Sequence, residues 1–446
     1  MHRAGQFDHL YRNELASMRS ASLIRRIPQQ PQAAALADVR ADGSVHSAIL
    51  AVVWLTFAAS SIVFTEPAPV DIMFMGLIAL LPAAGLVAFT PALAVYIALW
   101  CIAASCGFLA GTLSHDLAAA TIFTGISLYL YVASFVLAAF VAQAPQRHTE
   151  LIFSGWTFAA LIAAIAGFVG YFQLIPGAFE LFTKFSRATG TFKDPNVFGP
   201  FLVVPFLYAL HLVLHRPWYR TLGPVLAAAA LALANLLSFS RGAWINLILA
   251  LAVYGVLAFA TARSKQQREK IVGIVTVGAA LVALVVLGVL QNDKMADFLE
   301  ERASLTQSYD VGPSGRFGGQ EKAIGLLLDH PFGIGAGEFT AVYHHEEVHN
   351  VFLSMFLNAG WLGGLTYALM VVLTLVVGLK HLRVDSRARP LFLIAFAAFV
   401  ATAFEGIIID SDHWRSFYVL MALVWGQSTS PFPISESGNE ASWETR

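Results

Sequence analysis

The residues best suited to chemistry lie in one polar stretch, from Ser314 to Asn350, of a chain that is otherwise strongly apolar. This stretch contains Arg316, the glycine-rich run G-I-G-A-G and the run H-H-E-E-V-H-N that ends at Asn350. A histidine, whose ordinary pKa is about 6.5, can act as a general base at neutral pH. An arginine guanidinium can hold a phosphate group through two hydrogen bonds at once. We therefore look for the reaction site in this stretch first.

The composition predicts an integral membrane protein. Of the 446 residues 57% are hydrophobic and 12% are charged, whereas about 25% are charged in soluble domains. Apolar runs of about twenty residues have the length of a helix that crosses a hydrocarbon layer of roughly 30 Å. The bilayer core contains no water to hydrogen-bond the backbone N–H and C=O groups, so these groups must bond to one another. Such long continuous runs therefore favour helices over alternating strands. We expect an all-α polytopic bundle, and a net charge of -1 gives no indication of a nucleic-acid partner.

About twelve transmembrane helices are expected, with proline and glycine at most of their junctions. The two cysteines, Cys101 and Cys106, lie within one apolar run, where a helix points them to different sides, and we interpret them as apolar fillers. The expected runs fall near residues 47–64, 70–89, 92–110, 118–142, 151–174, 197–214, 221–239, 242–260, 271–290, 350–379, 391–409 and 413–427.

The placement of lysine and arginine predicts how these helices are oriented. Residues 1–45 are expected to form an arginine-containing cytoplasmic tail, followed by a retained first span, and residues 428–446 a second cytoplasmic tail. The two tails and the loops on their side hold about two thirds of all lysines and arginines, as the positive-inside tendency requires. The long loop of residues 291–350 then lies on the opposite, periplasmic side.

Few cations remain on that opposite face, and a bound polyanion would explain them. In the run from Arg187 to Pro200, Asp194 is expected to cap a helix. The N-terminus of that helix, beside Lys193 and Asn196, suits an anionic head group. Capping alone explains this motif equally well.

A second motif, L-S-F-S-R-G-A-W, joins two spans with almost no loop and places Arg241 at the membrane interface. There Arg241 either extends to lipid phosphates or holds a lipid-linked pyrophosphate. Glu405 is the nearest exception to a charge-free interior, and it lies close to the outer end of its span.

Two motifs in the loop have competing interpretations. The G-I-G-A-G run lacks the Lys-Ser/Thr of a phosphate-binding P-loop, so we interpret it as a turn that ends a helix over residues 321–328. His345 to His349 reads H-E-E-V-H, which matches the zinc-protease pattern if both histidines share a helix face. A charge at Glu347 and the lack of a third ligand nearby argue against that zinc site.

Taken together, G-T-F-K-D-P-N-V-F-G, S-F-S-R-G-A-W, S-G-R, H-P-F-G-I-G-A-G-E-F and the later H-N resemble the O-antigen ligase and polysaccharide polymerase family. The resemblance covers residues 185 to 375. It implies a bacterial inner-membrane glycosyltransferase of the C-type class, with N-terminal transmembrane helices over residues 46–180 and a catalytic transmembrane region over residues 181–427.

The resemblance also implies the substrates and the site. The donor is a glycan on undecaprenyl pyrophosphate, and the acceptor is a lipid A core or the growing polysaccharide, as in lipopolysaccharide or exopolysaccharide synthesis. His349 is the expected base, and Arg241 and Arg316 are expected to hold the pyrophosphate, with no cofactor and no metal. Further substrate contacts are expected from Arg187, Lys193, Asn196, His345, Asn350 and Glu405.

Three questions stay open at this point. A twelve-span transporter of a lipid-linked or small anionic substrate is the main competing function, although it would place ionisable residues at mid-membrane. The motifs do not separate ligase from polymerase. They also leave open whether His345 or His349 faces the acceptor.

Overall fold

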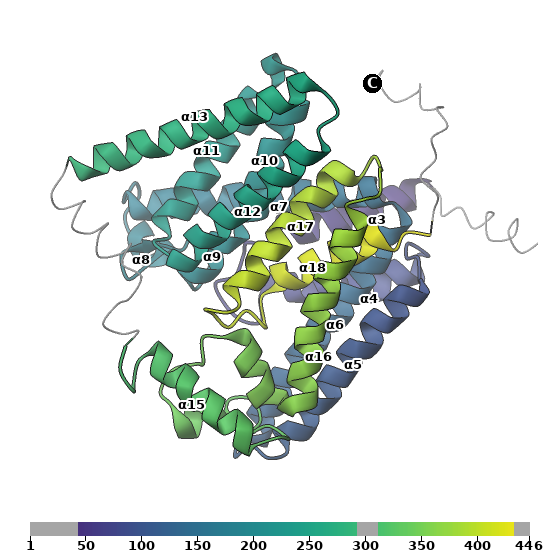
Figure 1. Ribbon diagram of the computed structural model, residues 1–446, viewed down its shortest axis with the longest axis vertical. Coiled ribbons are helices and arrows are strands. Elements are labelled where there is room, and N and C mark those ends of the chain that lie inside the picture. Colours follow the sequence, from purple (N-terminus) through teal and green to yellow (C-terminus); the bar gives the residue numbers. More distant parts are fainter. Residues whose placement is uncertain (1–42, 292–310, 432–446) are drawn as a thin grey trace, which may run out of the picture. The chain divides into compact units, whose positions relative to one another are not determined.

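The computed structural model describes residues 43–291 and 311–431, and these are mostly helical (Figure 1). The chain divides into residues 1–49 and a larger unit, residues 50–446, to which the following description applies. Both expected cytoplasmic tails fall almost wholly outside the described residues. The helices are α3 (Gly43–Ala58), α4 (Pro69–Ala83), α5 (Pro91–Gly111), α6 (Leu117–Gln143), α7 (Pro145–Tyr171), α8 (Ala178–Phe182), α9 (Pro195–Phe201), α10 (Val203–His215), η1 (Trp218–Arg220), α11 (Leu222–Leu237), α12 (Arg241–Thr261), α13 (Lys265–Leu290), α15 (Arg316–Asp329), η2 (Phe339–Tyr343), α16 (Val351–His381), α17 (Arg389–Glu405) and α18 (Arg415–Ser428).

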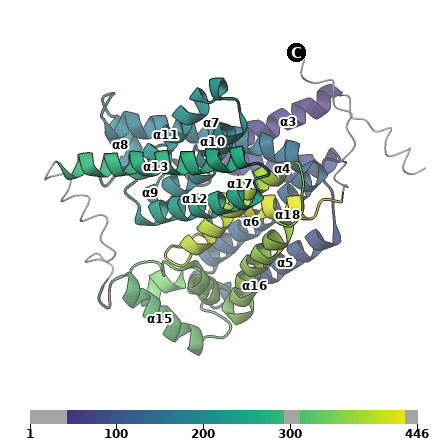
Figure 2. The ribbon, with the colours of Figure 1, turned by 45° about the horizontal axis from the view of Figure 1, so that its top comes forward.

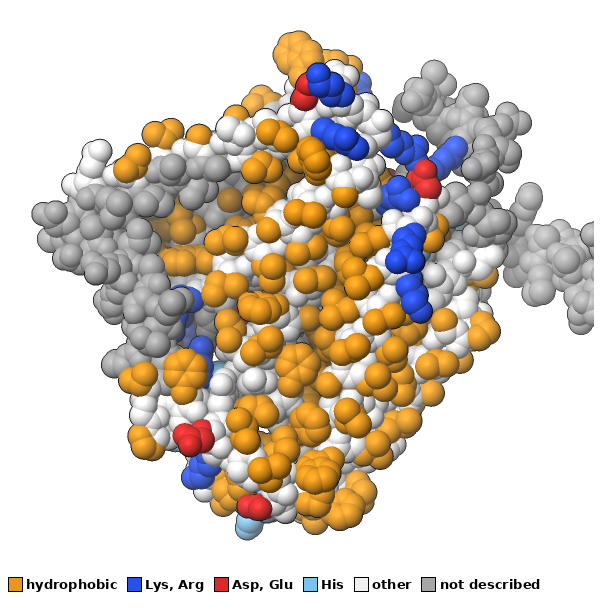
Figure 3. Space-filling model, in the orientation of Figure 1, with side chains coloured by type: hydrophobic (Ala, Val, Ile, Leu, Met, Phe, Trp, Pro, Cys, Tyr) orange, Lys and Arg blue, Asp and Glu red, His pale blue; other side chains and the backbone are white. Residues whose placement is uncertain are grey.

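The described helices are those of a membrane protein. Six are long and apolar enough to cross a bilayer: α5, α6, α7, the run Pro195–His215, α12 and α16. Large apolar side chains such as Ile248 and Leu365 are 67% and 60% exposed, and Figure 3 shows a broad hydrophobic surface bordered by lysines and arginines. Lipid, rather than water, suits such a surface. The expected all-α membrane fold is confirmed, and the total of twelve spans stays a prediction.

The helices pack in pairs that bring distant parts of the sequence together. α16 packs along α5, α18 along α6 and α12 along α17, and Figure 2 shows α5, α6 and α16 as neighbours. Glycines allow the close approach: a Cβ on Gly426 would lie 2.6 Å from the carbonyl oxygen of Ala138. Small residues at helix contacts are typical of membrane bundles, because they let backbones approach closely.

The buried centre of α5, α6, α16 and α18 is aromatic. Trp100 stacks on Tyr131 with ring centroids 4.1 Å apart, and Tyr367 and Tyr418 pack around them. The hydroxyls of Tyr96 and Ser134 lie 2.6 Å apart. This core fixes the relative positions of the helices whose ends carry the polar residues.

Two local features near those ends differ from the expected structure. Residues 183–184 and 187–188 form a two-stranded antiparallel ladder, β1 and β2, where a loop was expected. α16 is kinked at Gly360, which has a φ of 67° and divides a short first section from the long apolar remainder. Glycine suits this position because L side chains rarely adopt that conformation.

The polar loop folds against the helices as a small lobe. Its α15 begins five residues before the helix expected at residues 321–328, and a glycine-rich turn follows it, as predicted. The N–H groups of Ile334 and Gly335 both donate to the carbonyl oxygen of Leu357 in α16, at 2.8 and 3.3 Å. These N–H groups therefore dock the lobe on α16 and are not free to bind phosphate. A cluster of Ala323, Ile334, Phe339, Val348 and Leu357 forms the lobe's apolar centre.

Candidate functional site at the start of α16

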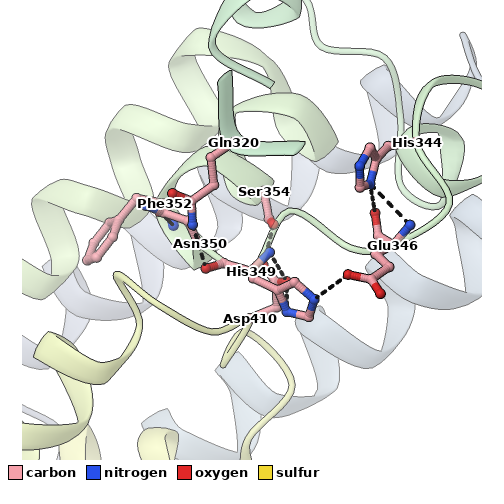
Figure 4. Close-up of polar contacts among 8 residues, drawn as sticks. All are labelled: Gln320, His344, Glu346, His349, Asn350, Phe352, Ser354 and Asp410. Atoms are coloured by element: carbon pink, nitrogen blue, oxygen red, sulfur yellow. Dashed lines mark hydrogen bonds and ion pairs between the residues drawn. The ribbon is translucent and has the colours of Figure 1, made fainter. Parts of the chain in front are cut away.

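His349 lies where the polar lobe joins α16, and its backbone is held on both sides (Figure 4). Its N–H donates to Asp410 Oδ2 at 2.7 Å, and its carbonyl oxygen accepts a hydrogen bond from Gln320 Nε2 at 3.1 Å. The φ of His349 is 54°, in the left-handed region that non-glycine residues adopt at a cost. These two hydrogen bonds offset that cost and fix where the imidazole points.

The imidazole of His349 lies between two carboxylates. Its Nδ1 is 4.0 Å from Asp410 Oδ2, its Nε2 is 3.7 Å from Glu346 Oε2, and its side chain is 26% exposed. Asp410 is itself oriented, because its Oδ1 accepts a hydrogen bond from the Ser354 hydroxyl one turn into α16. The ring is therefore positioned by a fixed carboxylate while part of it stays accessible.

Asn350 serves as the cap of α16. Its Oδ1 accepts hydrogen bonds from the N–H groups of Phe352 and Leu353 at 3.1 and 3.2 Å, which satisfies two donors of the first turn. The N–H of Val351, the first residue of α16, donates to the carbonyl oxygen of Gly406 at 2.8 Å. Asn350 thus fixes the start of the helix directly after His349.

The other two histidines of the run differ sharply in exposure. His344 is buried, stacked on Phe339, and Gly319 leaves room for its ring, since a Cβ there would lie 3.2 Å from it. The His345 side chain is 61% exposed and 3.8 Å from Glu346. Of the three histidines, His349 combines a fixed backbone with partial exposure, so the geometry favours it over His345.

The H-E-E-V-H run is not helical. Residues 345–350 are irregular, so His345 and His349 do not share the helix face that the zinc-protease interpretation requires. Among residues 43–291 and 311–431, no three histidine, cysteine or acidic side chains are grouped as metal ligands. The zinc interpretation therefore loses the geometry on which it rested.

Arg316 begins α15, the helix that touches His349. Gln320, which donates to the His349 carbonyl oxygen, follows Arg316 by four residues. Residues four apart share one helix face, so Arg316 lies on the side of α15 that carries this contact. The guanidinium expected from the sequence is thus placed on the helix face that contacts the histidine.

Arg241 begins α12 and adjoins the end of α17. The Ser240 side chain caps α12 by accepting from the Ala243 N–H at 3.3 Å. Gly242 lies against Glu405, because a Cβ there would be 2.8 Å from Glu405 Oε1. Glu405 is the last residue of α17, and its neighbour Gly406 bonds to Val351 at the start of α16. The starts of α12 and α16 therefore meet the end of α17.

Glu405 itself is fully enclosed. It is 1% exposed, and its Oε2 accepts a hydrogen bond from Asn246 Nδ2 at 2.6 Å. Its expected role as a substrate contact stays a prediction, whereas its contacts with α12 are those of a helix-to-helix link.

Three further expected substrate contacts lie near the start of α9, the helix that follows the β1–β2 ladder: Arg187, Lys193 and Asn196. Arg187 donates from Nε to the Ser238 carbonyl oxygen and from Nη2 to Asn196 Oδ1, both at 2.8 Å. Arg187 therefore ties this segment to the turn just before Arg241. The predicted cap is confirmed, since Asp194 Oδ1 accepts from the Asn196 N–H at 2.7 Å. Lys193 lies 3.7 Å from Glu66 in a partly exposed ion pair.

The sequence reasoning missed the carboxylates of the turn between α17 and α18. This turn reads D-S-D-H-W-R after an apolar run, and Asp410 contacts His349 while Asp412 is buried beside it. Burial, with the charge of Asp410 nearby, raises the pKa of Asp412 to about 7. Two carboxylates at the end of an apolar run were a usable signal, but nothing local linked them to residue 349.

Fold and site together define a helical membrane protein in which arginines, carboxylates and one positioned histidine gather where helix ends meet. Residues 226–368 match the family model described as O-antigen ligase, so this part of the chain is similar to that family. The matched range includes Arg241, Arg316 and His349 and ends before Glu405 and Asp410. No curated protein matches the chain.

Proposed function

We propose that this protein transfers a glycan from undecaprenyl pyrophosphate to a hydroxyl acceptor on the periplasmic side of a bacterial inner membrane. The observation that carries the proposal is His349, held by Asp410 and Gln320 at the point where α12, α15, α16 and α17 converge. The O-antigen ligase match over residues 226–368 supports an enzyme of this class.

In the proposed reaction, His349 is the general base. The acceptor hydroxyl gives its proton to Nε2, its oxygen bonds to the anomeric carbon, and the bond from that carbon to the pyrophosphate oxygen breaks. The electron pair leaves with undecaprenyl pyrophosphate, and one displacement inverts the anomeric centre. Asp410 acts as a positioning residue, since a carboxylate beside Nδ1 orients the ring and favours the imidazolium as it forms.

Arg241 and Arg316 are proposed to hold the departing pyrophosphate without a metal ion. A planar guanidinium can bind two phosphate oxygens at once, and fixed positive charge stabilises a leaving group as its negative charge develops. Both arginines are also the first residues of their helices, where the helix dipole favours an anion. Arg187 and Asn196 extend this polar surface.

Transfer by the purified full chain in liposomes tests the proposal. Undecaprenyl pyrophosphate carrying a glycan is supplied with either lipid A core or free polysaccharide, and the product is separated on a gel. Transfer to one acceptor and not to the other decides between ligation and polymerisation. Movement of the donor across the bilayer with no new glycosidic bond would instead support the transporter. Loss of transfer with a strong chelator, restored by zinc, would contradict a metal-independent mechanism.

A further inference from the structure

A cavity lies at the ends of α12 and α17 that are far from His349. It has a volume of about 290 Å³ and is enclosed by the ends of α10 and α12, the start of α13 and the turn that leads into α17. The residues of α12 that line the cavity, Tyr254 to Thr261, lie about 20 to 30 Å along the helix from Arg241. The cavity therefore has no part in the proposed transfer reaction.

The cavity has an apolar base and a cationic rim. Its base includes Tyr254 and Ala258 of α12, Ile271 of α13 and Leu393 of α17. Its rim carries Arg263, Arg387, Arg389 and the acid Asp385. This division suits a ligand with an anionic head and an apolar tail.

The single acid of the rim is shared between two of its arginines. Asp385 Oδ1 accepts a hydrogen bond from Arg263 and lies 3.5 Å from Arg389 Nη1. With three arginines and one aspartate, the lining residues carry more positive than negative charge. This positive charge favours an anionic ligand.

The rim also holds a hydroxyl whose hydrogen-bonding capacity is unused among the described residues. Ser386 Oγ is buried and has no hydrogen-bond partner there. A buried hydroxyl without a partner is costly, so a ligand oxygen at this point would be favourable. Ser386 follows Asp385 directly, so the hydroxyl and the guanidiniums border the same cavity.

The cavity opens where lipid head groups are expected. Val256 on α12 and Val272 on α13 are 68% and 52% exposed, and such apolar side chains match lipid tails. Figure 3 shows lysines and arginines bordering this hydrophobic surface. The positive-inside tendency explains cations on this side, but it does not explain why three of them surround a cavity with an apolar base.

We propose that this cavity binds an anionic phospholipid of the surrounding bilayer. The rim arginines and Ser386 hold its phosphate, and the beginning of one acyl chain lies on Tyr254 and Ala258. Basic pockets between transmembrane helices on the cytoplasmic side suit such head groups, and guanidiniums pair well with phosphate. The bound lipid joins the ends of α12 and α13 to the start of α17.

Lipid binding by the purified wild-type chain in detergent tests this proposal without any substitution. Native mass spectrometry is performed in an equimolar mixture of phosphatidylglycerol and phosphatidylethanolamine. We expect phosphatidylglycerol to be retained preferentially and to raise the melting temperature by a few degrees. Equal retention of the two lipids would overturn the proposal. The same rise with inorganic phosphate alone would show that the cavity binds free phosphate and does not recognise a lipid.

A matched pair of double variants localises the effect. Arg263→Gln with Arg387→Gln removes two rim charges, and Lys380→Gln with Arg383→Gln removes two exposed charges nearby that do not line the cavity. At about 1 kcal/mol per basic residue, the first pair is expected to lose about thirtyfold in phosphatidylglycerol affinity. The second pair is expected to lose less than about threefold. Equal losses in both pairs would show only a general surface attraction and would overturn the site.

Discussion

His349 and Asp410 are joined twice, through the histidine backbone and through its ring. The backbone bond holds an unfavourable conformation in place, and the carboxylate sets the direction of the imidazole. Ser354 completes the arrangement by bonding the other oxygen of Asp410. The position of the proposed base therefore depends on a residue that lies 61 positions away in the sequence.

Replacing His349 with alanine is expected to lower the transfer rate by about 100- to 10,000-fold, because a positioned base is removed. Asp410→Asn keeps an oxygen for the backbone bond and should lose less. The exposed His345 provides the control, and His345→Ala should retain most activity. Initial rates in liposomes at saturating acceptor measure all three. Near-normal transfer by folded His349→Ala would contradict its role as base.

Arg241→Lys and Arg316→Lys are each expected to weaken donor binding by about 1–3 kcal/mol. Lysine keeps the charge but cannot bind two oxygens in the plane of a guanidinium. The donor concentration at half-maximal rate should rise, with acceptor dependence unchanged. The control is Arg268→Lys in α13, which follows the end of α12 that is far from Arg241. Unchanged donor dependence in the double variant would argue against these two arginines as pyrophosphate ligands.

Asp412 makes stability depend on pH. Its pKa is raised from 3.8 to about 7 in the folded protein, so the folded state keeps a proton that the unfolded state releases above pH 4. Its contribution is therefore most favourable below about pH 4 and declines by at most about 4 kcal/mol as the pH rises to about 7. Asp412→Asn should flatten this decline in melting temperature, whereas exposed Glu180→Gln should not. An unchanged slope in Asp412→Asn would show that the carboxyl is already ionised.

Among the elements, the glycine-rich turn of the lobe makes a close contact with the end of α5. Gly335 has a φ of 92°, and a Cβ there would lie 2.9 Å from the Ala110 carbonyl oxygen at the end of α5. Gly335→Ala is expected to destabilise the docked lobe by about 1–3 kcal/mol through backbone strain and overpacking. Gly325→Ala, with open space around the same lobe's α15, should be neutral or stabilising. Limited proteolysis of the lobe distinguishes them, and equal resistance of both variants would refute this docking.

The sequence predicted elements better than their contacts. Apolar runs such as 118–142 locate helices because spanning length and backbone satisfaction leave few alternatives. The Asp194 cap could also be predicted from the sequence, since a cap acts on residues two or three positions away. The pairing of His349 with Asp410 could not be predicted, because it depends on how α16 and α17 pack. The burial of Glu405 against Gly242 is of the same long-range kind.

For the whole molecule, charge asymmetry predicts twelve spans with both termini cytoplasmic. Reporter fusions are expected to place residues 263–270 and Lys322 of the lobe on opposite sides of the membrane. A fusion after Arg383 should agree with the first of these positions. The physical reason is that basic loops are retained on the cytoplasmic side. Detection of residues 263–270 and Lys322 on the same side would rule this orientation out.

The convergence of helix ends around His349 also determines which concentration scale applies to each substrate. A donor with a lipid tail reaches these ends by diffusing within the plane of the bilayer, so its supply is a surface density, in molecules per lipid. Diluting it with carrier lipid lowers the encounter frequency while the molar amount in the tube stays constant. A lipid A core acceptor is diluted in the same way, because it is also anchored in the bilayer, whereas free polysaccharide arrives from solution and follows ordinary molarity. With free polysaccharide as the acceptor, the two substrates therefore saturate the same site on different concentration scales.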